Sequence, residues 1–311
     1  MHVHSSRPSG RPSGDPIPVT GGPFSRRQKL VGYVALTKPR IIELLLVTTV
    51  PTMFVAERGV PSIWLMVATM VGGTLAAGGA NAVNMVVDRD IDSLMERTMH
   101  RPLVRGVMSP RAALTFAVVI EVVAFVWLFA TVNLLSAALA ASATFFYVFV
   151  YTLWLKRTTT QNIVIGGAAG AVPVLVGWSA VTNSLAWSPV ILFLLIFFWT
   201  PPHFWALAIK YRDDYEAASV PMLPSVVSIE ETVRKMAFYT VVLVVLTVVF
   251  SPVADMGAVY LVSALILGAV FGVMVEAVRR RPTEQTAMRL FSFSITYLTL
   301  LFGAMVIDVL V

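Results

Sequence analysis

The 311-residue chain has no cysteine, and only 13% of its residues carry a charged side chain. The lack of cysteine excludes disulfide bonds, thiolate metal ligands and a cysteine nucleophile. The scarcity of charge, together with 57% hydrophobic residues, lies far from the average composition of a soluble domain. This composition is typical of a polytopic membrane protein that contacts the lipid bilayer. The net charge of +6 is then a matter of membrane topology and indicates no nucleic-acid partner.

Long apolar runs divide the chain, and most of them are close to the ~20 residues that span a bilayer as a helix. They lie at residues 41–56, 63–86, 113–132, 134–154, 163–181, 188–208, 236–252, 257–278 and 290–311. The runs are continuous and lack the alternation of polar and apolar residues that marks a transmembrane β-strand. We therefore predict an all-α polytopic membrane protein with nine transmembrane helices.

The basic residues are distributed unevenly between the two sides of the predicted spans. Of the 23 Lys and Arg residues, 22 precede the first span or follow spans two, four, six and eight, and only Arg58 falls on the other side. Because basic loops stay in the cytoplasm, we predict a cytoplasmic amino terminus. Residues 1–28 are rich in Pro, Gly and Ser and are expected to form a disordered cytoplasmic tail, followed by a single domain at 29–311.

An acidic cluster follows the second predicted span directly. Asn84, Asp88 and Asp92 are spaced by four residues, so a helix would place their side chains on nearly one face over ~12 Å. Oxygen ligands on one face suit Mg²⁺, which proteins hold with one or two carboxylates plus substrate phosphates. The pattern predicts a magnesium–diphosphate site at the membrane surface. The alternative is a solvated loop in which the aspartates cap helices.

A second acidic cluster follows the sixth predicted span and contains Lys210, Asp213 and Asp214. The predicted topology places both clusters on the same side of the membrane, and Arg97 and Arg101 accompany the first. Departure of a diphosphate requires metal-binding acids and phosphate-binding cations, because the leaving group gains negative charge as its bond to carbon breaks. The arginines also have a simpler explanation, since cytoplasmic loops carry cations whatever the chemistry.

Four segments carry a resemblance to a known family. They read NMVVDRDIDSLMERTMHRPL (84–103), WTPPHFWALAIKYRDDYEAASVPMLP (199–224), LTKPR (36–40) and YTLWLKR (151–157) followed by QNIVIGGAAG (161–170). In these segments the chain resembles the protohaem IX farnesyltransferase (haem O synthase) family of the intramembrane, UbiA-type prenyltransferase superfamily. The resemblance covers about residues 30–300. The N-x-x-x-D-x-x-x-D pattern belongs to the whole superfamily, whereas PPHFW and KR…QNIVIGG point to haem.

The resemblance implies a prenyltransferase whose helices surround a central cavity. The implied reaction transfers the farnesyl group of farnesyl diphosphate to a vinyl group of haem b, with addition of water, and releases diphosphate. Mg²⁺ is the implied cofactor, and haem is a substrate. The resemblance assigns the metal to Asn84, Asp88 and Asp92, with Asp213 or Asp214 completing the same cluster or a second one.

Roles for further residues follow from the same resemblance. The residues expected to be catalytic are Asn84, Asp88, Asp92, Lys210, Asp213 and Asp214. The residues expected to bind the diphosphate are Lys38, Arg97, Arg101, Lys156 and Lys210. Lys210 stands four residues before Asp214, where superfamily relatives commonly carry another aspartate. We therefore expect the charge of Lys210 to replace a second magnesium ion there, with a second ion as the alternative.

The candidate haem-contacting residues are His203, Trp205 and His100, with His203 as a candidate iron ligand. A hydrogen-bonded interfacial histidine is the alternative for His203. The expected location is a bacterial plasma (inner) membrane, with the catalytic loops on the cytoplasmic side. Because haem O is poorly soluble, direct handover to a haem A synthase or a terminal oxidase is a further hypothesis.

Two other functions remain open at the level of the sequence. One is a prenyltransferase that acts on an aromatic quinone precursor. The other is an ion-coupled transporter that uses Asp88, Asp92 and Asp214. Transport would place charged groups near the middle of the membrane, whereas these acids cluster at one predicted face.

Overall fold

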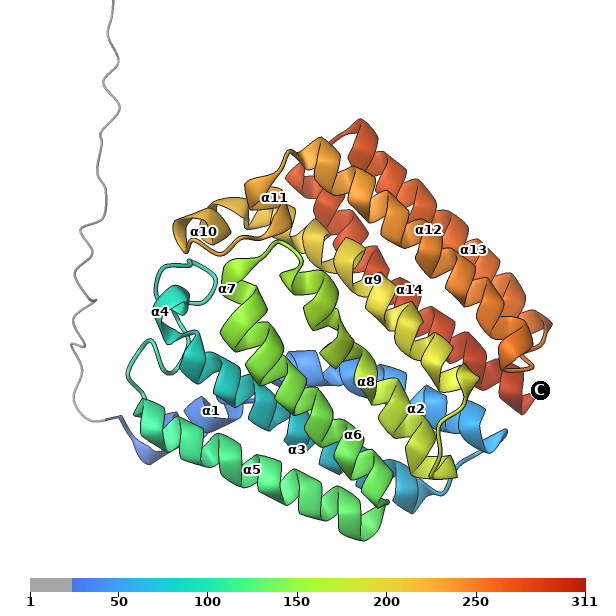
Figure 1. Ribbon diagram of the computed structural model, residues 1–311, viewed down its shortest axis with the longest axis horizontal. Helices are drawn as coiled ribbons and strands as arrows, with labels where there is room; N and C mark the ends of the chain where they lie inside the picture. Colours follow the sequence, from blue (N-terminus) through green and yellow to red (C-terminus); the bar gives the residue numbers. More distant parts are fainter. Residues whose placement is uncertain (1–23) are drawn as a thin grey trace, which may run out of the picture.

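The computed structural model describes residues 24–311, with the side chains of 40–46 excepted. This part of the chain is helical and contains no β-strand, which confirms the all-α prediction. Within it, eight helices are long and apolar enough to cross a membrane (Figure 1). They are α3 (Ile63–Val87), α5 (Pro110–Thr131), the continuous α6, η1 and α7 (Leu134–Thr158), α8 (Asn162–Thr182), α9 (Trp187–Lys210), α12 (Ile229–Val253), α13 (Ala258–Arg280) and α14 (Glu284–Leu310).

The first predicted span, 41–56, corresponds to helix α2 (Pro39–Glu57), which packs against α8 and α14. Helix α2 is not among the eight spans found over the described residues, so the count of nine transmembrane helices stays a prediction. The cytoplasmic orientation of the amino terminus also stays a prediction. Most of the predicted tail, residues 1–23, lies outside the described residues. Helix α1 (Arg26–Leu36) begins inside the predicted tail, where Ser25 and Gln28 form a capping box.

Polar residues at the ends of the apolar runs determine where several helices begin. The Ser109 side chain accepts a hydrogen bond from the backbone of Ala112, and Pro110 occupies the first position of α5. The Asn133 side chain accepts from Ser136 in the same way, so only two residues separate the end of α5 from the start of α6. The Asn133 cap thus folds α6 back on α5 with a short connection.

The short helices gather at one end of the long ones (Figure 1). They are α4 (Arg89–Asp92), α7 (Lys156–Thr158), α10 (Arg212–Ala217) and α11 (Leu223–Val226). The segment after the first acidic cluster touches the second cluster there, because the backbone N–H groups of Glu96 and Arg97 each lie 3.4 Å from a carboxylate oxygen of Asp214. The two clusters are therefore neighbours in space.

The close approach of α2 and α8 depends on Gly177. A Cβ atom added there would lie 2.5 Å from the backbone oxygen of Thr49, whereas one added at Gly170, also in α8, would meet nothing within 4 Å. We expect Gly177→Ala to lower the free energy of unfolding by about 1–3 kcal/mol, because the backbone of α2 must move. Thermal unfolding in detergent measures this, with Gly170→Ala as the matched control. Equal stability of the two variants would contradict the packing.

Candidate active site

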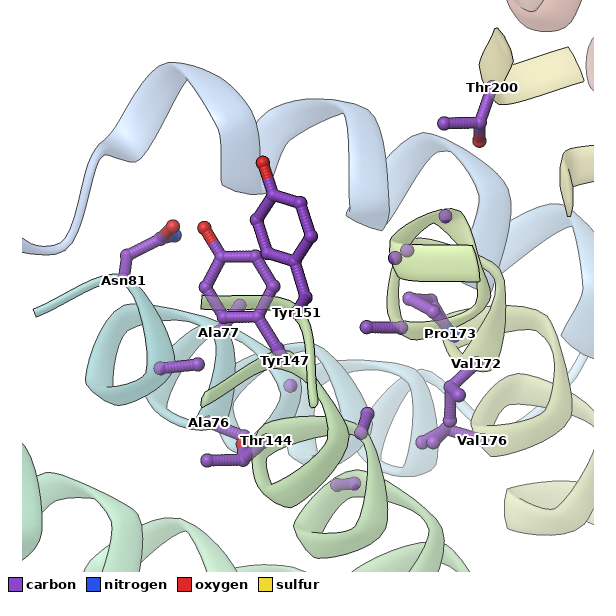
Figure 2. A pocket seen from close by; sticks show the side chains of 18 of the residues that line it. Ala76, Ala77, Asn81, Thr144, Tyr147, Tyr151, Val172, Pro173, Val176 and Thr200 are labelled. Carbon is purple, nitrogen blue, oxygen red and sulfur yellow. The ribbon is translucent and has the colours of Figure 1, made fainter. Parts of the chain in front are cut away.

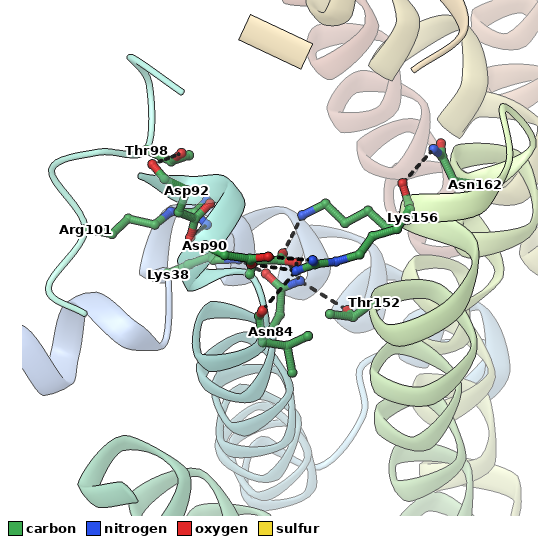
Figure 3. A network of polar contacts seen from close by, with 12 residues as sticks. Lys38, Asn84, Asp90, Asp92, Thr98, Arg101, Thr152, Lys156 and Asn162 are labelled. Carbon is green, nitrogen blue, oxygen red and sulfur yellow. Dashed lines mark hydrogen bonds and ion pairs between the residues drawn. The ribbon is translucent and has the colours of Figure 1, made fainter. Parts of the chain in front are cut away.

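Asn84, near the end of α3, is the centre of a buried hydrogen-bonded network (Figure 3). Its side-chain amide donates to Asp88 Oδ2 at 2.7 Å and to Thr152 Oγ1 at 3.1 Å. Its Oδ1 accepts from Lys38 Nζ at 2.8 Å. The network therefore ties together the residue before α2, the end of α3, and η1 (Phe146–Leu155).

Asp88 is fully buried and forms an ion pair with Lys156 through its Oδ2 atom. The other carboxylate oxygen, Oδ1, is buried and has no hydrogen-bond partner, although Arg157 Nη2 lies 3.8 Å away. A buried charged oxygen without a partner costs free energy unless something binds to it. The Oδ1 atom therefore marks a place for a ligand.

Asp92 extends the same face beyond the end of α3. The backbone of Asp88 donates to the carbonyl of Asn84 at 2.9 Å, and that of Asp92 donates to the carbonyl of Asp88 at 2.8 Å. The spacing predicted for a helix is thus kept across the boundary between α3 and α4. The Asp92 side chain is also buried, and its Oδ2 accepts from Arg101 Nη1 at 2.5 Å.

Cations outnumber acids in this network. Lys38, Arg101 and Lys156 face two carboxylates, those of Asp88 and Asp92. Burial, followed by repulsion from Arg101 and Lys156, lowers the pKa of Lys38 from 10.5 to about 7. A bound anion would restore the balance of charge. The network therefore has the charge and the donors to hold a phosphate or diphosphate group.

The donor set also fits a magnesium ion. The unpartnered Oδ1 of Asp88, the carboxylate of Asp92 and the amide oxygen of Asn84 are hard oxygen ligands. Among the described side chains, which exclude those of residues 40–46, no group of three or more His, Asp or Glu converges, so phosphate and water oxygens would complete the coordination. The full ligand set, including Asp214, stays a prediction.

The second acidic cluster is close to this network, but in the contacts of the described residues no hydrogen bond or ion pair joins it to the side chains of Asn84, Asp88 or Asp92. Asp214 accepts from the two backbone N–H groups given above, and Asp213 is exposed. Lys210 Nζ is bound at 2.9 Å to Glu284 Oε1 at the start of α14. The structure thus does not join Lys210, Asp213 or Asp214 to Asp88 by hydrogen bonds. Their roles in metal or charge binding stay predictions.

The other predicted residues occupy three different environments. Arg97 lies over the ring of Tyr211 at 5.5 Å, beside the second acidic cluster. His100 is exposed in the segment after α4. Trp205 is buried, with its ring edge-on to Tyr239. The predicted roles of Arg97 in binding diphosphate and of His100 and Trp205 in binding haem stay predictions.

His203 is sandwiched between two aromatic rings on the side of α9 that faces α14. Its ring lies 4.2 Å from that of Trp199 and 4.6 Å from that of Phe291, both stacked. Its Nδ1 atom lies 2.6 Å from Ser294 Oγ. The Nδ1 atom is thus hydrogen-bonded, as the alternative interpretation expects, and both interpretations of His203 stay predictions. With Nδ1 engaged, Nε2 is the ring nitrogen left to ligate iron, and that role stays a prediction.

A cavity of about 290 Å³ lies beside the charged network, between α3, α6, η1, α8 and α9 (Figure 2). Small side chains make up much of its wall, among them Gly73, Ala77, Ala140, Gly166, Gly167 and Gly170. The cavity and the network share two elements. Asn81 lines the cavity one turn before Asn84, and Tyr151 lines it next to Thr152. The arrangement suits a ligand with an anionic head and an apolar tail.

Sequence reasoning missed Asn81 and Thr152. Both lie at helical spacing from residues that were predicted: Asn81 three residues before Asn84, and Thr152 four residues before Lys156. Extending the predicted face by one helical turn in each segment would have found them. The structure brings four predicted residues into contact with Asn84 or its acidic neighbours. They are Lys38, Asp88, Arg101 and Lys156, with Asp92 in the same chain of contacts.

The lowered pKa of Lys38 predicts pH-dependent anion binding. A bound anion favours the charged amine, so binding above pH ~7 must take up a proton. We expect the affinity for inorganic diphosphate to fall by up to roughly tenfold per pH unit between about pH 7 and pH 9. Calorimetric titration of the wild type against Lys38→Met measures the difference, because the titration of diphosphate itself is common to both. If the affinity for diphosphate changed with pH equally in the wild type and in Lys38→Met, the prediction would be wrong.

An aspartate-bearing cationic network beside an apolar cavity, inside a bundle of membrane-spanning helices, suits a membrane enzyme whose ligand has an anionic head and an apolar tail. Residues 45–300 match the model of the UbiA prenyltransferase family. The chain belongs to this family and is a prenyltransferase.

Curated relatives and solved structures agree with this assignment. A protein of Frankia alni named protoheme IX farnesyltransferase is 55% identical over 288 residues, which cover 91% of this chain and 99% of the relative. One of the same name from Streptomyces avermitilis is 51% identical over 292 residues, covering 92% and 95%. A structure described as digeranylgeranylglyceryl phosphate synthase in membranes has a TM-score of 0.75 at 17% identity, covering 91% and 99%. The structure of a UbiA homologue from Archaeoglobus fulgidus bound to DMAPP and Mg²⁺ has a TM-score of 0.62 at 15% sequence identity. The match covers 87% of this chain and 99% of that structure. At these identities the structures show a shared fold.

Proposed function

We propose that this enzyme transfers the farnesyl group of farnesyl diphosphate to a vinyl group of haem b, with addition of water, to give haem O and diphosphate. The choice of haem as acceptor is supported by the names of relatives that are 51–56% identical over about nine-tenths of the chain. The observation that carries the donor is the cationic network at one side of an apolar cavity. The catalytic loops would then work at the cytoplasmic face of the plasma membrane.

The network and the cavity would bind different parts of the prenyl donor. Lys38, Arg101 and Lys156 would hold the diphosphate oxygens, as charge-assisted donors do. The apolar cavity would take the isoprenoid chain and keep water from the allylic carbon. Asp88 and Asp92 would hold Mg²⁺, which supplies neutralisation of the negative charge that the departing diphosphate gains. These residues orient the donor so that its carbon–oxygen bond can break.

The acceptor supplies the electrons for the new bond. The terminal carbon of the vinyl group attacks the allylic carbon, and water then adds to the cation formed beside the porphyrin ring. No side-chain nucleophile is needed, which agrees with the lack of cysteine. Because haem O is poorly soluble, we also propose direct handover to a haem A-forming enzyme or a terminal oxidase.

The test is a reconstituted assay of the full chain in liposomes with haem b, farnesyl diphosphate and Mg²⁺. We expect the porphyrin mass to increase by farnesyl plus water, and removal of Mg²⁺ by a chelator to suppress this by at least about a hundredfold. Adding Mg²⁺ back is the control. Prenylation of an aromatic acid with haem left unchanged would refute the proposed acceptor, and full activity in chelator would refute the metal.

A further inference from the structure

Tyr147 and Tyr151 place two phenol groups on the wall of the cavity (Figure 2). Their rings are stacked, with centroids 5.4 Å apart and an angle of 24° between the planes. In the contacts of the described residues, neither hydroxyl has a hydrogen-bond partner in the protein. By contrast, the hydroxyls of Thr69, Thr144 and Thr200, which line the same cavity, all donate to protein oxygens. The two phenols are therefore available to a ligand.

The position of Tyr151 is set by close packing. A Cβ atom added at Gly166 of α8 would lie 2.3 Å from Cδ2 of the Tyr151 ring. No side chain larger than hydrogen fits there while the ring stays in place. The ring is thus held against α8, and Figure 2 shows both hydroxyls at the same end of the two rings. A fixed pair of donors costs little further entropy when it binds a small molecule.

The π-helical geometry of η1 places the two tyrosines on the side of this segment that also carries Lys156 of the charged network. The segment is a π-helix, and the backbone of Lys156 donates to the carbonyl of Tyr151, five residues earlier. The separation of nine positions between Tyr147 and Lys156 corresponds to roughly two turns of a π-helix but about two and a half turns of an α-helix. The π-helix therefore presents Tyr147 and Lys156 on the same side, where an α-helix would oppose them. π-helical segments are rare in proteins, and those that occur often lie at functional sites.

The reacting atoms would lie near the two tyrosines, at the boundary between the charged network and the cavity. The allylic carbon is the one joined to the diphosphate, so it lies where the charged network ends and the cavity begins. Tyr151 is next to Thr152, which bonds to Asn84 of that network. Once the vinyl carbon has bonded to the allylic carbon, the positive charge is on the carbon attached to the porphyrin, two bonds away. The cation thus forms close to the two phenol groups.

We infer that Tyr147 and Tyr151 are specificity-determining residues whose hydroxyls hold the water molecule that adds to this cation. The inference rests on the proposed function. The oxygen of water forms a bond to the cationic carbon, and one proton of that water passes to the diphosphate released earlier. The tyrosines are unchanged. Without a held water, the cation loses a proton from the neighbouring carbon to the diphosphate and gives an alkene, lighter than haem O by one water.

The test uses the double variant Tyr147→Phe/Tyr151→Phe, which keeps both rings and removes both hydroxyls. The full chain is reconstituted with haem b, farnesyl diphosphate and Mg²⁺, and the porphyrin products are separated and weighed. We expect the ratio of hydrated to alkene product to fall at least tenfold, while prenylated porphyrin of both kinds still forms. Tyr239→Phe, the same substitution outside the cavity, is the control and should leave the ratio unchanged.

The outcomes separate the inference from the proposed function. An unchanged ratio in a double variant that still prenylates haem would overturn the inference alone. A wild type that gives no prenylated porphyrin would overturn the proposed function as well. The single variants carry the same test if the double variant is unstable. A smaller shift of the ratio in either one supports the inference, and wild-type ratios in both overturn it.

Discussion

Asp88→Asn is expected to reduce kcat/KM for prenyl transfer by roughly 10³-fold. The substitution keeps the size of the side chain but removes the negative charge that pairs with Lys156, and it replaces one of the two carboxylate oxygens by an amide nitrogen that cannot ligate a metal ion. Asp88 is fully buried, so solvent cannot compensate for the loss of that charge. Steady-state kinetics of the reconstituted enzyme over a range of Mg²⁺ concentrations measures the loss.

Asp90→Asn is the matched control, because Asp90 belongs to the same acidic cluster but points outward. Its carboxylate is 63% exposed and is held by Arg157 at 2.7 Å, and this partner lowers the pKa of Asp90. Exposed ion pairs contribute about 1 kcal/mol or less, so activity should change by no more than a few-fold. Equal losses in the two variants would show that Asp88 has no special role in the site.

The sequence was sufficient to predict those features that depend on local pattern. Apolar runs of membrane-spanning length predicted the all-α fold, since a helix satisfies its own backbone within lipid. The four-residue spacing placed Asn84, Asp88 and Asp92 on one face, and the backbone hydrogen bonds across the end of α3 confirm that spacing. Both features are set by neighbours along the chain.

Features that depend on distant neighbours could not be predicted from local pattern. Lys210 pairs with Glu284, on a helix near the end of the chain, and no local pattern indicates this partner. Glu121, an acid in the middle of α5, could not be placed from the sequence. In the structure it accepts from Thr144, and Gly79 of α3 leaves the room for its carboxylate. Packing between helices decides these positions, and the spacing of residues within one helix does not report it.

The π-helix η1 was also invisible in the sequence, for a different reason. Its residues, Phe146–Leu155, are almost all apolar, so they show no contrast from which the number of residues per turn can be determined. The backbone hydrogen bond from Lys156 to the carbonyl of Tyr151 shows the π-helix, which places Tyr147 on the cavity and Lys156 beside Asp88. The relation between the tyrosines and the charged network therefore required the structure.

The substitution Gly170→Phe is expected to change which prenyl donor the enzyme accepts. Gly170 lines the cavity one helical turn beyond Gly166, and a Cβ atom there would meet nothing within 4 Å. A phenyl ring would fill space that the farnesyl chain needs but leave the charged network intact. We expect kcat/KM for farnesyl diphosphate to fall by roughly a hundredfold or more, because a filled pocket excludes the longer chain. Dimethylallyl diphosphate, with a single isoprene unit, should lose much less.

Gly272→Phe separates the effect of a filled cavity from that of an added ring. Gly272 is exposed on α13, outside the cavity, and also has nothing within 4 Å of an added Cβ atom. This variant should keep the wild-type preference for farnesyl diphosphate. Competition assays with both donors in one reaction give the ratio of the two kcat/KM values directly, independent of the amount of folded enzyme. If Gly170→Phe lowered both values equally, the isoprenoid chain would have to bind elsewhere, since a cavity that holds the chain discriminates by length when it is shortened.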